Sequence, residues 1–152
     1  MHPDDPTTTH AAAPQSRIET ASESEAEAIC AGLRGFNSEI IGAYEFRSLW
    51  LAARDADGRV IGGVVGYVGL GWLHLEVLWV EQAARGRGLG AALLLQAERR
   101  AREWGARQVH LDTFDWQAEG FYLKHGYREF GRLHDFPPGR QRLFLQKSLS
   151  SE

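Results

Sequence analysis

Apolar and polar residues follow one another with two different periods along this chain, and the periods separate strands from helices. Residues 47–54 and 59–70 are rich in strand-forming side chains and flank a hairpin signal at Asp57-Gly58, which predicts two antiparallel strands. A third strand follows over residues 72–80. Four glycines between residues 62 and 69 predict bulges or the close packing of a neighbouring element.

A long amphipathic helix is predicted after the third strand. Its apolar residues recur at helical spacing and are expected to face the sheet, namely Leu89, Leu93, Ala97, Ala101 and Trp104. The polar side is expected to face water, with Glu98, Arg99, Arg102 and Glu103. Gly105 ends this helix, and residues 108–114 form a strand parallel to residues 72–80, because a helix crosses between the two.

The two ends of the chain complete the fold. Before the hairpin, residues 17–20 are interpreted as an opening strand and residues 23–34 as a helix capped by Ser22 or Ser24. Gly35 ends that helix, and a second short helix begins at Asn37 or Ser38. Near the C-terminus come a helix at 117–125 and strands at 127–133 and 142–149. Together the elements predict an α+β fold: a mixed, mostly antiparallel sheet with helices on both faces.

Length and composition indicate one globular domain. The chain has 152 residues, of which 43% are hydrophobic and 24% charged, so residues 17–149 can form a full core, and residues 1–16 are expected to be a disordered tail. A net charge of -3 gives no overall attraction to nucleic acid or to anionic membranes. The sequence has no apolar run long enough to span a membrane and does not start like a signal peptide. The single cysteine, Cys30, is expected to be buried, and the location to be cytoplasmic.

A glycine-rich turn precedes the long helix. Gly86, Gly88 and Gly90 let the backbone pass close to a bound group, and the first N–H groups of a helix have no partners within it. The helix dipole adds partial positive charge there, and Arg85 and Arg87 add full charges. The turn is therefore predicted to hold a pyrophosphate.

Two nucleotide-binding motifs contain a similar glycine-rich turn before a helix. A P-loop needs a lysine and a hydroxyl residue after its last glycine, whereas Ala91 and Ala92 follow Gly90, so that motif is excluded. A dinucleotide fingerprint is matched formally, with Asp112 about 20 residues further on. Its first glycine, however, should follow a strand directly, and five residues separate Val80 from Gly86. A dinucleotide-binding module stays an alternative.

The spacing Arg85-x-x-Gly88-x-Gly90, between a strand that ends in Leu-Trp-Val and a helix that opens with Ala-Ala-Leu-Leu, resembles the acetyl-CoA motif of the GNAT superfamily of N-acetyltransferases. Residues 115–127 resemble the later helix of that family, with its alanine, tyrosine and glycine-aromatic pattern. The resemblance covers residues 17–149 and is strongest over 72–127. It implies the α+β fold described above and an enzyme that moves an acetyl group from acetyl-CoA to an amine.

The resemblance also implies where acetyl-CoA binds. The strands at 72–80 and 108–114 splay apart, so that backbone groups are free to bond the pantetheine arm and to stabilise the oxyanion. Tyr122 lies near the sulfur and protonates the leaving thiolate. Asp115 replaces an asparagine that bonds the pantetheine in many relatives, and is expected to cap the later helix instead. The expected cofactor-binding residues are Leu78, Trp79, Val80, Arg85, Gly86, Arg87, Gly88, Leu89, Gly90, Ala91, Phe121 and Tyr122.

The general base is expected on the third strand. Alternation places His74 and Glu76 on one face together with Leu78, at positions where many relatives carry a base that acts directly or through water. A structural interpretation stays open, in which both side chains face solvent or Glu76 pairs with an arginine. His110 and Asp112 on the next strand are further candidates. The histidines lack metal-ligand spacing, so no metal is predicted.

The acceptor is expected to be a small cationic amine, because the residues that the resemblance places around it are aromatic and acidic. These are Phe36, Asn37, Tyr44, Phe46, His134, Asp135, Phe136 and Arg140. A catalytically silent acyl-CoA sensor is the alternative for this architecture. Aromatic residues in the loop after residue 133 further predict a homodimer.

Overall fold

The structure is a computed structural model that describes residues 16–150. The tail predicted for residues 1–16 therefore lies outside the described residues except for Ser16. The chain divides into two compact units, Met1–Ala43 and Tyr44–Glu152, which are described separately.

The first unit contains one helix, α1 (Glu23–Ile41). Ser22 caps it as predicted: its hydroxyl accepts from the Glu25 backbone, and the Glu25 carboxylate accepts from the Ser22 backbone. The two predicted helices are one: Gly35 has no positive φ and lies within the helix, whereas Gly42, with a positive φ of 80°, is its C-cap. The predicted strand at 17–20 is not formed, since no described strand pairs with these exposed residues.

Within its own unit, α1 buries no residue. Its apolar side chains nevertheless recur at helical spacing, with exposed fractions of 67% for Ile29, 62% for Leu33 and 67% for Ile40. The prediction that Cys30 is buried is wrong, because it shares the exposure of the helix that carries it.

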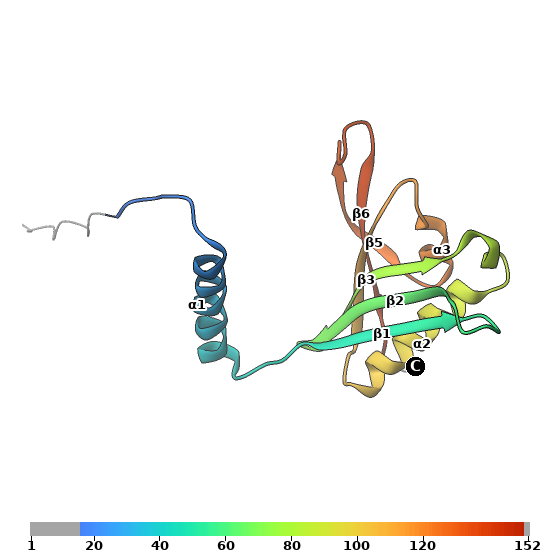
Figure 1. Ribbon diagram of the computed structural model, residues 1–152, viewed down its shortest axis with the longest axis horizontal. Helices are drawn as coiled ribbons and strands as arrows, with labels where there is room; N and C mark the ends of the chain where they lie inside the picture. The colour runs from blue at the N-terminus through green and yellow to red at the C-terminus, as the bar shows by residue number, and fades with distance from the viewer. Residues whose placement is uncertain (1–15, 151–152) are drawn as a thin grey trace, which may run out of the picture. The chain divides into compact units, whose positions relative to one another are not determined.

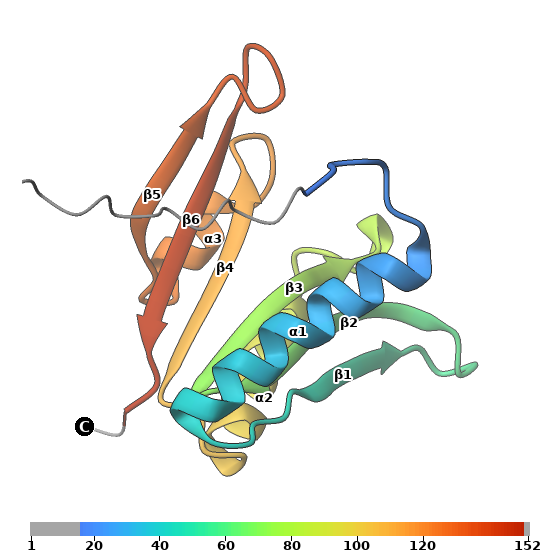
Figure 2. The same cartoon turned by 90° about the vertical axis from the view of Figure 1, so that its left-hand side faces the viewer.

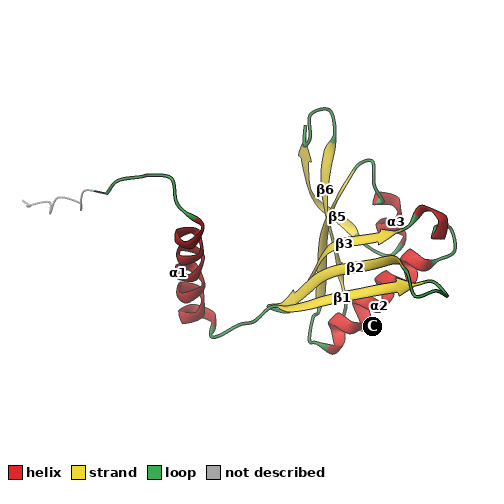
Figure 3. Cartoon of the chain, in the orientation of Figure 1, coloured by secondary structure: helices red, strands yellow, loops and turns green. Residues whose placement is uncertain are grey.

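The second unit is a six-stranded sheet (Figures 1 and 3), and its strands lie in the order β1-β2-β3-β4-β6-β5 (Figure 2). All neighbouring strands are antiparallel except β3 and β4, so the predicted mixed, mostly antiparallel sheet is confirmed. The elements are β1 (Arg47–Arg54), β2 (Val60–Gly69), β3 (Trp72–Val80), a short 3-10 turn η1 (Gln82–Ala84), α2 (Leu89–Glu103), β4 (Gln108–Phe114), α3 (Glu119–Lys124), β5 (Arg128–His134) and β6 (Gln141–Ser148).

The core lies between α2 and the sheet, and α2 contacts β1, β2 and β3. Leu93, Ala97 and Ala101 are buried as the helical spacing predicts, and Leu94 is buried beside them. The strands contribute alternate residues to the same core, including Leu49, Val64, Leu73, Val109, Leu111 and Leu145. This packing sets the start of α2 against the end of β3.

Glu98 of α2 is buried, with 2% of its surface exposed, although the helical pattern predicts that it faces water. Its carboxylate accepts hydrogen bonds from the Tyr127 hydroxyl (2.9 Å) and from the Lys147 ammonium (2.9 and 3.0 Å). Lys147 lies on β6, 49 residues away, so the helical period alone does not reveal that the charge is matched.

Candidate active site

Strands β3 and β4 are paired only over their first halves. The last pair is Leu75 with Leu111, whereas β4 continues to pair with β6 as far as Phe114 and Arg142. Figure 2 shows β3 and β4 diverging towards their ends. The edge of residues 76–80 that faces β4 is therefore without a strand partner, as predicted.

A β-bulge lies at the point where the two strands separate. Val65 of β2 is opposite Val77, but Gly66 is opposite Leu75, so Glu76 is an extra residue without a partner on β2. The bulge reverses the alternation after Leu75, and Leu78 packs against the core on the same side as Leu73 and Leu75. The prediction that Leu78 shares a face with His74 and Glu76 is therefore wrong.

The turn before α2 has the geometry of an anion cradle. Gly86 and Gly88 have φ of 77° and 79°, and a Cβ atom added to either glycine would meet nothing within 4 Å. Gly88 is the N-cap of α2, and no side chain caps the helix. The backbone N–H groups of the first turn and the positive end of the helix dipole are thus open to an anion, so the residues fit a pyrophosphate.

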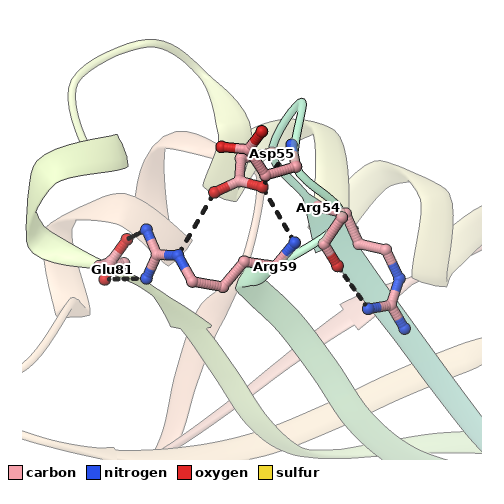
Figure 4. A network of polar contacts seen from close by, with 6 residues as sticks. Arg54, Asp55, Arg59 and Glu81 are labelled. Atoms are coloured by element: carbon pink, nitrogen blue, oxygen red, sulfur yellow. Dashed lines mark hydrogen bonds and ion pairs between the residues drawn. The ribbon is translucent and has the colours of Figure 1, made fainter.

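Polar contacts hold the loop that leads to this cradle (Figure 4). Arg59, the last residue of the turn between β1 and β2, donates to both carboxylate oxygens of Glu81 (2.8 and 3.0 Å). Its backbone N–H donates to Asp55 (2.9 Å). Arg85, predicted to contact the pyrophosphate, donates from Nε to the carbonyl of Val80 (2.9 Å). That carbonyl is therefore engaged by the protein itself.

A cleft of about 840 Å³, called here the main cleft, runs from the cradle into the space between β3 and β4. Every predicted cofactor-binding residue except Arg87 lines it. Glu76 lines it too, and within residues 16–150 its carboxylate has no ion-pair or hydrogen-bond partner. The main cleft also includes residues outside the predicted set, namely Leu75, Val77, Asp112, Thr113, Trp116, Gln117, Ala118 and His125.

Tyr122 of α3 reaches the main cleft from the core side and is 6% exposed. Burial raises the pKa of its hydroxyl to about 12, so the group stays protonated at neutral pH. Its ring packs edge-on against Phe121 (5.2 Å between centroids) and Tyr127 (5.5 Å).

His74, the other predicted base, lines a different cleft of about 400 Å³. Its Nδ1 lies 2.8 Å from the Tyr67 hydroxyl, and its ring stacks on His110 at 4.4 Å. Burial, and then the neighbouring His74, lower the pKa of His110. The structure thus separates the two predicted bases, and of these only Glu76 lines the main cleft.

This architecture and the cradle agree with the comparisons to known proteins. The model of the acetyltransferase (GNAT) family matches residues 13–127. The chain belongs to this family. A blasticidin-S acetyltransferase of Streptomyces morookaense is 46% identical over 93 residues, which are 60% of this chain and 68% of that protein. The acetyltransferase Atu2258 of Agrobacterium fabrum is 33% identical over 131 residues, which are 86% of this chain and 96% of that protein.

A crystal structure of an acetyltransferase from Bacillus cereus ATCC 14579 is 34% identical and superimposes with a TM-score of 0.83, covering 88% of this chain and 97% of that one. The protein is accordingly a GNAT acyltransferase. Sequence resemblance had indicated the same family and the same fold.

In this GNAT enzyme, the predicted acceptor residues lie in several places. Phe36 and Asn37 belong to the first unit. In the second unit, the ring of Tyr44 meets Phe46 edge-on at 5.7 Å. His134 ends β5, and Asp135 and Phe136 lie in the β5–β6 loop, where the Phe136 ring is parallel to Phe114 at 6.1 Å.

Asp115 does not cap the later helix of the GNAT pattern. The N-cap of α3 is Ala118, without a side-chain hydrogen bond. Asp115 instead accepts from the backbone of Gln141 (3.2 Å) and pairs with Arg140 (3.4 Å). Its carboxylate therefore joins the turn after β4 to the β5–β6 loop, and sequence reasoning missed this because the two segments are 26 residues apart.

Within residues 16–150, no group of three or more His, Cys, Asp or Glu residues is arranged to hold a metal ion. In the same part of the GNAT chain, no helix is long and apolar enough to cross a membrane.

Proposed function

We propose that this enzyme transfers an acetyl group from acetyl-CoA to the primary amine of a small cationic molecule, by direct attack while both substrates are bound. The supporting observation is that one cleft connects the anion cradle with an unpaired carboxylate and a buried tyrosine hydroxyl. When bound, acetyl-CoA supplies an activated acyl carbon and a thiolate leaving group.

Backbone groups are assigned the role of binding the donor, acetyl-CoA, at one end of the cleft. The N–H groups of Leu89, Gly90 and Ala91 at the start of α2 hold the pyrophosphate, and Arg85 and Arg87 add positive charge beside it. The free edge of β3 offers backbone groups of Leu78 and Trp79 to the pantetheine arm. A backbone N–H on this edge donates to the oxyanion as negative charge develops on the acyl oxygen.

Glu76 is assigned the role of general base. An ammonium group must lose a proton before its nitrogen can attack, and the Glu76 carboxylate accepts that proton directly or through a water molecule. The bulge makes this possible, because it removes Glu76 from the β2 pairing and turns the following residues to the other side. His74 lines the other cleft and is not given a direct role.

Tyr122 is assigned the role of general acid. Its hydroxyl donates a proton to the departing thiolate as the bond between carbon and sulfur breaks, and the phenolate then recovers, through water, the second proton that the attacking nitrogen loses as it becomes an amide. The raised pKa, about 12, keeps this proton available at neutral pH.

A small cationic acceptor agrees with the negative charge of Glu76 in the main cleft. It also agrees with the name of one relative, a blasticidin-S acetyltransferase. The predicted homodimer is a separate expectation: light scattering should give a mass near twice 17.0 kDa, and a mass near 17.0 kDa would contradict it.

The test is a panel of small primary amines incubated with acetyl-CoA and the full chain, with free thiol as the readout. Thiol release that depends on an amine, with a matching rise in product mass, supports the proposal. Binding of acetyl-CoA without release for any amine would favour the silent sensor. A rise in Tm with NAD and none with acetyl-CoA would favour a dinucleotide-binding module.

A further inference from the structure

Three aromatic rings form a parallel stack at the side of the main cleft. Trp116 lies 4.4 Å from Phe114 with 12° between the ring planes, and Phe114 lies 6.1 Å from Phe136 with 13° between them. These three residues are called here the aromatic shelf. Trp116 lines the main cleft and keeps 47% of its surface exposed.

Neighbouring side chains hold the shelf in place. The Arg142 guanidinium lies 5.7 Å from the Phe114 centroid and 5.3 Å from that of Phe136, and it pairs with Asp112 at 2.7 Å. The Gln117 side-chain oxygen accepts from the Phe114 backbone at 2.9 Å. A ring fixed in this way loses little conformational freedom when a ligand stacks on it.

Backbone contacts also join the shelf to the β5–β6 loop. Asp115 and Gln141 exchange two hydrogen bonds, of 3.1 Å from the Asp115 backbone and 3.2 Å to its carboxylate. Phe136 and Arg140 of the same loop contact the rings of Phe114 and Trp116. Within residues 16–150, the hydrogen bonds and ring contacts of the shelf are with β4, the turn after it, β6 and the β5–β6 loop, and none is with residues 85–91.

The surface of Trp116 is only partly covered. The Arg140 guanidinium lies 5.1 Å from the centroid of the Trp116 ring. This contact is looser than the one between Arg47 and the Trp104 ring, where the same distance is 3.7 Å. The Arg140 side chain is itself 51% exposed. Trp116 therefore keeps 47% of an electron-rich ring surface exposed, in the same cleft as the unpaired carboxylate of Glu76.

We propose that Trp116 binds the acceptor by stacking on a planar aromatic or heteroaromatic ring, so that the preferred acceptors carry a flat ring and a primary amine in one molecule. This inference rests on the proposed function, because it names the acceptor class of the same cleft. Glu76 interacts with the ammonium end, and Trp116 with the ring.

The test compares two series of primary amines with similar basicity and chain length, one ending in an aromatic ring and one in an alkyl group. Wild-type enzyme should show the lower KM for the ring series. Trp116→Ala should raise that KM about 10-fold or more and leave the KM of the alkyl series unchanged. Trp116→Phe should restore much of the difference, because it keeps a ring that stacks.

Trp50→Ala is the matched control, since Trp50 is 72% exposed on β1 and lines neither cleft. Its KM values should equal those of wild type. An equal loss for both series in Trp116→Ala, or no loss, would overturn the inference. So would a higher KM for acetyl-CoA, because Trp116 would then contact the donor.

The two proposals fail in different ways. If wild-type enzyme acetylates amines without preferring the ring series, the proposed function stands and the shelf inference is wrong. If it binds acetyl-CoA and acetylates neither series, both are wrong. A melting curve of each variant separates a lost contact from a lost fold.

Discussion

The two ends of the main cleft are built in different ways. At the donor end, glycines and the start of α2 present backbone N–H groups, and the side chains there add general positive charge. At the acceptor end, side chains from β3, β4 and the turn after β4 form the surface, and hydrogen bonds and ring contacts with β6 and the β5–β6 loop fix its shape.

This difference explains at which end of the cleft the side chains can be exchanged without loss of donor binding. Backbone groups recognise a pyrophosphate in the same way whatever side chains surround them, so the donor end suits one donor for a whole family. Side chains at the acceptor end can be exchanged without disturbing that geometry. Substitutions at the donor end should therefore affect every acceptor equally, whereas those at the acceptor end should depend on the acceptor.

The largest effect is expected between the two ends, at Tyr122. Tyr122→Phe keeps the ring and its packing but removes the proton, so turnover should fall by about 10²- to 10⁴-fold while the Kd for acetyl-CoA stays unchanged. Because the pKa of Tyr122 is raised to about 12, its ionisation should not limit the wild-type rate below pH 10. The measurement is kcat with donor binding by calorimetry.

Tyr127→Phe is the control for that change, because Tyr127 is a second buried tyrosine whose hydroxyl donates to Glu98 and does not line the main cleft. It should lower the Tm and leave kcat within a few-fold of wild type. Wild-type turnover in Tyr122→Phe would mean that the tyrosine only packs.

The next effect tests the donor end. Gly88→Val places a β-branched side chain at φ of 79° in the space assigned to the pyrophosphate, and Gly90→Val fills the same cradle from the helix. Acetyl-CoA at 100 times its wild-type Kd should stabilise wild type by about 2.7 kcal/mol and neither variant measurably. Thermal shift measures this.

Gly71→Val separates the cradle from backbone strain, since Gly71 has φ of 80°, equally open surroundings and no place in the cleft. It should lose stability like Gly88→Val and keep the shift with acetyl-CoA. Micromolar donor binding in both Gly88→Val and Gly90→Val would place the cradle elsewhere.

A smaller, pH-dependent effect is expected at the acceptor end. Glu76→Gln removes the proposed base, so kcat/KM should fall about 10²-fold near neutral pH and recover partly as the pH rises and the amine loses its proton unaided. The part of the acidic limb that the ionisation of Glu76 sets should disappear, and the part that the amine sets should remain. His74→Ala should keep the wild-type profile, and a changed profile there with none in Glu76→Gln would assign the base to His74.

The smallest effect is expected at the ion pair between Arg59 and Glu81, in the polar contacts of the loop that leads to the cradle. Arg59 is 62% exposed and its partner Glu81 is 30% exposed, so solvent screens their ion pair. Arg59→Ala should lower the Tm by less than about 4 °C and raise the Kd for acetyl-CoA only slightly. A large loss of donor affinity would show that this pair, and not the backbone alone, shapes the donor end.

The donor end was predictable because its parts are close together in the sequence. The glycines, the start of α2 and the end of β3 lie within residues 78–91, and local period and turn chemistry give their conformation. The strands and the parallel pair β3–β4 followed from the same local signals. The tyrosine of α3 was found through a second local pattern, at residues 115–127.

The acceptor end was not predictable in this way. One extra residue at Glu76 reverses the alternation of β3, and the bulge is visible only in the pairing with β2. Asp115 bonds a loop 26 residues away, and Glu98 is buried because β5 and β6 bring Tyr127 and Lys147 to it. Such contacts depend on which distant segments become neighbours, and no local pattern encodes that.

By itself, the sequence determined the elements of the second unit, the sheet with its single parallel pair and the donor cradle, because these follow from side-chain period, glycine conformations and helix-end chemistry within short segments. Only the tertiary structure decided that Glu76 and His74 line separate clefts and that Trp116, Phe114 and Phe136 stack. The physical reason is that register and long-range packing place these side chains, and both are properties of the assembled sheet.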